Sequence, residues 1–180
     1  MQKTIHKLFW LWDFDKEEAW LNEMAAKGLV LAEVGYARYV FEDKAPGAYQ
    51  IRLEMLQKQP SHPESQDYIR FLEETGAEHI GTFYSWVYFR KNTNEGSFDL
   101  FSDVESRIKH LNRILVIPSI LLAFTLLNSY SWIDRYIENN DAGNLAVALL
   151  LSVLSLFMMY AFIRLFVKRL KLKKDSRLYE

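Results

Sequence analysis

The chain has no cysteine, and only 7 glycines, 4 prolines and 4 histidines occur among its 180 residues. Without cysteine there is no disulfide, no thiolate nucleophile and no cysteine-ligated zinc site. The histidines do not have the spacing of a metal-binding helix, and the sequence contains no glycine-rich phosphate-binding motif. We therefore expect no catalytic residues, no metal and no cofactor, and predict that the protein is not an enzyme.

Charge is unevenly distributed, although the formal net charge is only −1. Residues 1–99 contain 11 Lys/Arg and 16 Asp/Glu, whereas residues 164–180 contain 7 Lys/Arg and 2 Asp/Glu. Such an asymmetry indicates that the two ends of the chain face different surroundings.

Two uncharged apolar runs occupy residues 114–133 and 142–163. At about 1.5 Å per residue, a helix of either length spans roughly 30 Å, the thickness of the hydrocarbon layer of a bilayer. We predict two transmembrane helices joined by a short external loop, residues 134–141. The alternative is a pair of buried helices in a soluble protein, for which such lengths without a charged face are uncommon.

Lys and Arg residues flank the outer ends of these runs, whereas the loop between them contains only Arg135. By the positive-inside rule, we expect a two-pass protein of the cell membrane with cytoplasmic N- and C-termini. The basic tail, residues 164–180, directly follows a span, so its expected partner is the lipid bilayer and not nucleic acid. The residues expected to contact lipid headgroups are Lys168, Arg169, Lys171, Lys173 and Lys174.

The first 99 residues form a predicted cytoplasmic domain with the element order strand–helix–strand–strand, twice. The expected strands are residues 7–12, 29–34, 37–42, 49–56, 78–84 and 86–91, and the expected helices are residues 16–27 and 64–75. Capping-box spacing places helix N-caps at Asp15 and Ser61, and Gly28 and Gly76 follow the helices as stop signals. The "YQIRLEML" segment alternates apolar and polar residues, as expected of a strand with one buried face.

A shift of 48 residues superimposes the two copies of this pattern. Trp20 then matches Tyr68, Gly28 matches Gly76, and Phe41 matches Phe89. We predict an α+β fold in which a tandem βαββ repeat forms one antiparallel sheet with both helices on one side. This topology resembles the effector-binding domains related to the gyrase-inhibitor family, which implies binding of hydrophobic or amphipathic small molecules in a groove between the repeats.

A closer resemblance is carried by "WDFDKEEAWLNEMAAKG", "GAYQIRLEML", "FLEETG", "WVYFRK" and "FDLFSDVESRIKHLNRI". In combination these segments are similar to the domain-of-unknown-function family 2812, and the match covers essentially residues 3–114. The resemblance implies a bacterial membrane-associated protein, often encoded beside a PadR-type transcriptional regulator. It implies no activity and no catalytic residues.

Residues 100–113 predict an amphipathic linker helix that continues into the first span. Val104, Ile108 and Leu111 share one side of it, and Ser102 and Glu105 have capping-box spacing. Such a helix either transmits movement between domain and membrane or serves as a spacer.

The alternation in the last strand of each repeat predicts two different sheet faces. Tyr39, Phe41, Val87 and Phe89 are expected to face the helices, which leaves the opposite face rich in aromatic residues with a few charges. Such a face suits a small-molecule groove or a protein interface, unless the hairpin, the linker helix or a second subunit covers it. The residues assigned to this ligand or partner face are Trp10, Trp12, Arg38, Arg52, Glu54, Trp86, Tyr88 and Arg90. The acidic pairs at 17–18 and 73–74 are interpreted as solvated helix faces.

These features predict a non-catalytic, membrane-anchored sensor or adaptor. Its cytoplasmic domain is expected to bind a small amphipathic molecule, a membrane or regulatory protein, or a second copy of the chain. The alternative is an accessory subunit of a transporter or other membrane complex, whose hairpin packs against partner helices through Ala146, Ser152 and Ser155.

Overall fold

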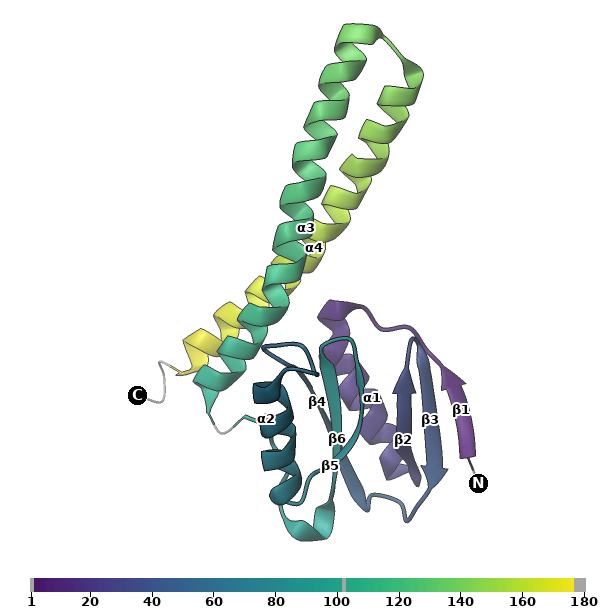
Figure 1. The fold of residues 1–180 in the computed structure, drawn as a ribbon, viewed down its shortest axis with the longest axis vertical. Coiled ribbons are helices and arrows are strands. Elements are labelled where there is room, and N and C mark those ends of the chain that lie inside the picture. The colour runs from purple at the N-terminus through teal and green to yellow at the C-terminus, as the bar shows by residue number, and fades with distance from the viewer. Residues whose placement is uncertain (1, 102, 177–180) are drawn as a thin grey trace. The chain divides into compact units, whose positions relative to one another are not determined.

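The computed structural model describes residues 2–101 and 103–176, which divide into two compact units, residues 1–102 and 103–180 (Figure 1). The first unit contains six strands, two helices and two short 3-10 turns. Its elements are β1 (Gln2–His6), η1 (Leu11–Asp13), α1 (Phe14–Ala26), β2 (Leu29–Gly35), β3 (Arg38–Asp43), β4 (Tyr49–Met55), α2 (Pro63–Glu74), β5 (Glu78–Phe83), β6 (Trp86–Asn92) and η2 (Thr93–Glu95). The second unit consists of α3 (Val104–Asn139) and α4 (Ala142–Ser176). The predicted α+β class with a C-terminal helical hairpin is confirmed.

Backbone hydrogen bonds form two antiparallel sheets of three strands each, in the orders β1-β3-β2 and β4-β6-β5. The sequence predicted one continuous sheet. Instead, β2 and β5 lie side by side without forming a ladder. A side chain of β6 joins the two sheets, since Nη1 of Arg90 donates to the Leu31 carbonyl of β2 at 3.0 Å.

The two halves share several backbone features at an offset of 48 residues. Gly28 and Gly76 end the helices with φ of 85° and 90°. The strand pairing shifts register between Leu31 and Glu33 in the first sheet, and between His79 and Gly81 in the second. The halves therefore have the same strand order, the same glycine stop and a bulge at the same relative place.

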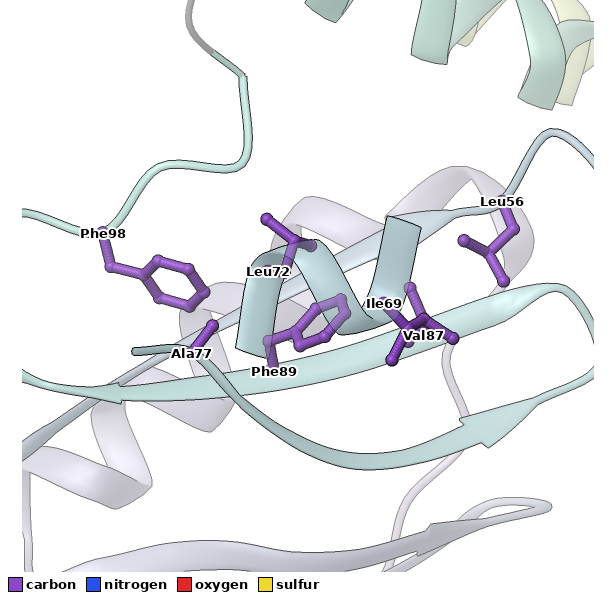
Figure 2. Close-up of a cluster of buried hydrophobic side chains, with 7 residues drawn as sticks. All are labelled: Leu56, Ile69, Leu72, Ala77, Val87, Phe89 and Phe98. Carbon is purple, nitrogen blue, oxygen red and sulfur yellow. The ribbon is translucent and has the colours of Figure 1, made fainter. Parts of the chain in front are cut away.

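The two helices cover different faces. Trp20 of α1 packs edge-on against Tyr39 and Phe41 of β3, with ring centroids 5.1 and 5.6 Å apart. On α2, Ile69 and Leu72 form a buried cluster with Phe89 of β6 and neighbouring side chains (Figure 2). The four strand residues predicted to face the helices, Tyr39, Phe41, Val87 and Phe89, do face them.

The sequence predicted both helices on one side of the sheet. In the structure, they do not share one side of the second sheet. Phe89 of β6 faces α2, whereas the hydroxyl of the preceding residue, Tyr88, donates to Glu17 of α1. Because successive residues in a strand point to opposite faces, α1 and α2 pack against opposite faces of this sheet (Figure 1). The buried side of α1 contacts both sheets, since Glu17 accepts hydrogen bonds from Tyr39 of β3 and Tyr88 of β6.

Three local predictions differ from the structure. The first strand is Gln2–His6, which pairs with β3, and not the aromatic segment 7–12. That segment supplies side chains to the surroundings of α1 instead: Phe9 packs on Trp20 at 5.6 Å. The helix caps are also displaced, because α1 begins after Asp13 without a side-chain cap and α2 is capped by the Nδ1 of His62.

The hairpin of α3 and α4 turns within Asn140–Asp141, so the helices extend beyond the predicted spans into the predicted loop. Asn140 takes the left-handed conformation that commonly ends a helix. The predicted linker helix continues directly into the first apolar run, and α3 is capped by Asp103, whose Oδ1 accepts from the Ser106 amide at 2.6 Å. Ser102, the predicted cap, lies outside the described residues.

Both helices of the hairpin are long and apolar enough to cross a membrane. Only 28% of the most apolar segment of α3 and 17% of that of α4 are buried, so these helices are not core helices of the unit that they form. Several buried residues of the hairpin are small or hydroxylated, in addition to large aliphatic ones: Ser129 and Ser152 hydrogen-bond between the helices at 2.7 Å, and Ala148 and Ser155 are buried. Close packing through such residues is typical of helices in membranes.

Candidate functional site: a buried carboxylate between two sheets

Glu17 is a carboxylate in the interior of the first unit. Its position in the first turn of α1 places it on the same side of the helix as Leu21 and Met24, which are four and seven residues further along. Only 8% of Glu17 is exposed. Because an unpaired buried carboxylate is costly, its hydrogen-bond partners determine what the site can do.

Two tyrosine hydroxyls donate to the same carboxylate oxygen. Tyr39 of β3 and Tyr88 of β6 each lie 2.7 Å from Oε1 of Glu17. The tyrosines belong to the central strands of the two sheets. One oxygen atom on α1 therefore connects both sheets, and we refer to Glu17, Tyr39 and Tyr88 as the carboxylate cluster.

Burial raises the pKa of Glu17 above its usual range, although the hydrogen bonds from Tyr88 and Tyr39 act in the opposite direction. Burial and the neighbouring Glu17 charge raise the pKa of both tyrosines, so their hydroxyls remain protonated donors. A carboxyl with a raised pKa takes up a proton at a higher pH than an exposed glutamate does.

The next residue, Glu18, serves the edge of the second sheet. Its Oε1 accepts from Arg52 at 3.1 Å and its Oε2 accepts from the Leu53 amide at 3.2 Å. Burial raises the pKa of Glu18, while Arg52 and the Leu53 amide lower it. One turn later, the Asn22 amide accepts from the Ile51 N–H and donates to the Ile51 carbonyl, at 2.9 and 2.8 Å. Side chains of α1 thus occupy the outer edge of β4.

Aromatic rings surround α1 beyond the carboxylate cluster. Trp20 packs on Tyr39, and the ammonium group of Lys7 lies over the Trp20 ring, 4.5 Å from its centroid. At the start of the helix, Phe14 packs on Trp86 at 5.5 Å. The carboxylate therefore lies in an environment of low polarity, where electrostatic interactions are stronger than in water.

The structure does not bring the eight predicted face residues together on one open face. Trp86 and Tyr88 do point away from α2, but α1 covers them, and Tyr88 is 3% exposed. The register pairs Arg52 with Phe89 and Glu54 with Val87, so both belong to the opposite, α2-facing side. There Glu54 is buried and accepts from the Tyr68 hydroxyl at 2.6 Å.

The remaining predicted face residues are dispersed. Trp12 is buried and stacks at 5.4 Å on Trp10, which is half exposed. Arg38 is exposed and pairs with Glu33. Arg90 joins the two sheets, as described above. The helix α1 thus covers the part of the predicted face that Trp86 and Tyr88 form.

Sequence reasoning missed two features of this unit. Glu17 was assigned to a solvated helix face together with Glu18, whereas only the pair Glu73–Glu74 is exposed. The second feature is an aromatic tip at the β2–β3 and β5–β6 turns, where Phe83 contacts both Tyr36 and Tyr84. Those two tyrosines, 48 residues apart, are 75% and 82% exposed.

The small residues proposed to contact partner helices are partly used within the hairpin. Ser152 bonds to Ser129 and Ser155 is buried, whereas Ala146 is exposed. The predicted headgroup residues Lys168, Arg169, Lys171, Lys173 and Lys174 all lie in the last part of α4. In the parts of the chain that the structure describes, no group of three or more His, Asp or Glu residues could hold a metal ion.

Replacing Glu17 with glutamine is expected to make stability less dependent on pH. Because the folded-state pKa of Glu17 is raised, its contribution is full below the ordinary value of about 4.5 and is lost as pH rises through the raised pKa. Each unit of that difference is worth about 1.4 kcal/mol. Glutamine resembles the protonated acid and should retain this stability at all pH values.

Urea unfolding of the full chain in detergent micelles, followed by tryptophan fluorescence between pH 4 and pH 8, measures this difference. We expect Glu17→Gln to gain stability relative to wild type as pH rises, while Glu73→Gln, on the exposed side of α2, follows wild type. Parallel pH profiles for wild type and Glu17→Gln would contradict the assignment.

Comparison with known proteins identifies a family model described as "Protein of unknown function (DUF2812)", which matches residues 13–125. The matched segment includes α1, both sheets except β1, and the first part of α3. No curated protein and no solved structure matches the chain.

Proposed function

Because the chain belongs to the DUF2812 family of proteins of unknown function, we propose its role from its own chemistry: a non-catalytic, membrane-anchored sensor. In this proposal α3 and α4 cross the membrane, both termini are cytoplasmic, and the first unit is the sensing domain. The orientation rests on the Lys and Arg residues outside the two apolar runs.

The observation that supports a sensing role is the carboxylate cluster. Glu17 holds hydroxyls from two sheets on one oxygen, and its raised pKa shows that burial is only partly compensated. A ligand that offers Glu17 a better partner would compete with both hydroxyls at once. Because each hydroxyl belongs to a different sheet, that competition would change how the sheets are held together.

The ligand class that fits is a small amphipathic cation. A positive charge would pair with the Glu17 carboxylate, and apolar groups would contact the aromatic rings around α1. We further propose that the two halves are copies of one βαββ unit, which accounts for their common strand order and bulge positions. The ligand would then act where the copies meet.

Titration of the full chain in detergent micelles with tetraphenylphosphonium tests the proposal. We expect a saturable change in tryptophan fluorescence that Glu17→Gln weakens at least tenfold, since a charge-assisted contact is worth about 1.5–3 kcal/mol. Glu73→Gln is the matched control, because it removes an exposed carboxylate and should leave the titration unchanged. This control also corrects for partitioning of the cation into micelles.

A titration that does not saturate, or one that Glu17→Gln leaves intact, would refute the sensor. If a membrane protein co-purified specifically with the chain at the same time, the accessory-subunit alternative would be favoured. The exposed aromatic tip at Tyr36 and Tyr84 would be a surface suited to such a partner.

A further inference from the structure

The ammonium group of Lys7 lies against two aromatic rings of the first unit. Its Nζ is 4.8 Å from the centroid of the Phe9 ring and 4.5 Å from that of the Trp20 ring. The two ring centroids are 5.6 Å apart and the ring planes are inclined at 43°. Distances below about 6 Å are those of cation–π contacts, in which the negative face of a ring attracts a positive charge. The two rings therefore form two walls that one cation contacts at the same time.

A carboxylate lies near the same cation. Glu23 follows Trp20 by three residues on α1, which places both side chains on one side of the helix. The hydrogen bond and the charge of Lys27 lower the pKa of Glu23, and the charge of Lys7 lowers it further. Lys7 is therefore within electrostatic reach of Glu23. Aromatic faces beside a carboxylate are suited to an organic cation.

The Lys7 side chain is only loosely held in this position. Lys7 is exposed and lies in the irregular segment between β1 and η1, where its backbone amide donates to the Ala37 carbonyl at 2.9 Å. Among the residues that the structure describes, none forms a hydrogen bond or a close ion pair with the Lys7 ammonium. A lysine ammonium has three N–H donors and is strongly hydrated, and aromatic rings do not replace that hydration well. A cation without N–H donors would suit the two rings better.

We propose that Phe9 and Trp20, with Glu23 beside them, bind a quaternary ammonium group, and that Lys7 is a built-in competitor that this ligand displaces. The positive charge of a quaternary ammonium group is covered by methyl groups. These contact ring faces directly and give up little hydration, which is why aromatic cages recognise such groups. The position of the Lys7 ammonium shows that a cation is accommodated at the two rings.

This site is separate from the carboxylate cluster, although the two are neighbours. Tyr39 packs against the Phe9 ring at 6.2 Å and against the Trp20 ring at 5.1 Å, and its hydroxyl donates to Glu17. The carboxylate of the proposed site is Glu23, which is exposed, whereas Glu17 is buried. The proposal therefore does not rest on sensing at Glu17, and different variants test the two sites.

The test titrates the full chain with choline, in micelles of an uncharged sugar detergent and at constant ionic strength. Dimethylbutanol, the neutral carbon isostere of choline, is titrated in parallel. Nuclear magnetic resonance of the indole N–H groups reports binding, and Trp20→Phe assigns the Trp20 signal. We expect choline to shift the Trp20 signal saturably, and dimethylbutanol at the same concentrations to leave it unchanged.

Removal of the competitor is the most direct variant. Lys7→Ala is expected to strengthen choline binding about two- to fivefold, because an exposed cation–π contact no longer has to be displaced. Lys58→Ala removes another exposed positive charge, in the loop before α2, and should leave choline binding unchanged. Phe9→Leu retains an apolar side chain without a ring and should weaken binding about threefold or more. Circular dichroism checks that each variant remains folded.

The site would be overturned if choline did not bind saturably, if choline and dimethylbutanol bound equally, or if Lys7→Ala gained no more than Lys58→Ala. Choline binding that Glu17→Gln abolishes and Phe9→Leu leaves intact would also overturn it, and would place the cation at the carboxylate cluster instead. Phosphatidylcholine added to the same micelles distinguishes the source of the ligand. Competition with choline would identify a lipid headgroup, whereas no competition would identify a soluble quaternary ammonium compound.

Discussion

Phe89→Ala is expected to lower the free energy of unfolding of the first unit by about 3–5 kcal/mol, the range typical of a large aromatic side chain removed from a core. Phe89 is completely buried on the central strand of the second sheet, where it packs with Ile69 and Leu72 of α2 (Figure 2). Its removal leaves a cavity between sheet and helix that neither can close without breaking other contacts. Urea unfolding followed by tryptophan fluorescence measures the loss.

Phe71→Ala is the matched control. Phe71 lies on α2, beside Leu72, but 59% of it is exposed. Its truncation should change stability by no more than about 0.5 kcal/mol, as is usual for surface positions. Similar losses in the two variants would show that α2 does not pack on the sheet through the face described above.

Arg90→Met is expected to cost about 2–3 kcal/mol, the upper range for hydrogen bonds to charged groups. The guanidinium binds Glu78 through Nε and Nη2 at 2.8 and 2.7 Å. Its Nη1 donates to Glu42 at 2.7 Å and to the Leu31 carbonyl at 3.0 Å. Only 11% of the Arg90 side chain is exposed, and methionine retains its apolar stem, so the loss reports the polar contacts between the sheets.

Arg38→Met removes the same group from a solvated ion pair. Arg38 and its partner Glu33 are 48% and 59% exposed, and such pairs contribute about 0–1 kcal/mol. The two variants should therefore differ clearly in urea unfolding. If they lost equal stability, the contacts of Arg90 would not be what holds β2 beside β5.

The sequence predicts most elements of this fold because their signals are local. Gly28 marks the end of α1, and a Cβ there would lie 2.9 Å from the Lys44 carbonyl, so the residue type is required by its surroundings as well as by its positive φ. Glu17 could also have been identified, since its spacing from Leu21 and Met24 places it on the apolar side of α1.

Other features depend on contacts between distant segments and have no local signal. The alternation in β4 correctly separates Ile51 and Leu53 from Arg52 and Glu54. Which of these pairs shares a face with Tyr88 depends on the register between β4 and β6, and a shift of one residue exchanges the faces. The contact of Arg90 with Leu31 likewise depends on two sheets meeting, which no periodicity within either strand encodes.

The way in which α1 occupies the outer edge of β4 has a consequence for assembly. Exposed strand edges can pair with other molecules. Here Asn22 and Glu18 already bond to the backbone of Ile51 and Leu53, and β2 and β5 lie against each other. The outer edge of β1 is then the remaining edge of the two described sheets. Association through strand pairing would join two molecules by their β1 edges and end there, whereas a second open edge would allow growth into a fibre.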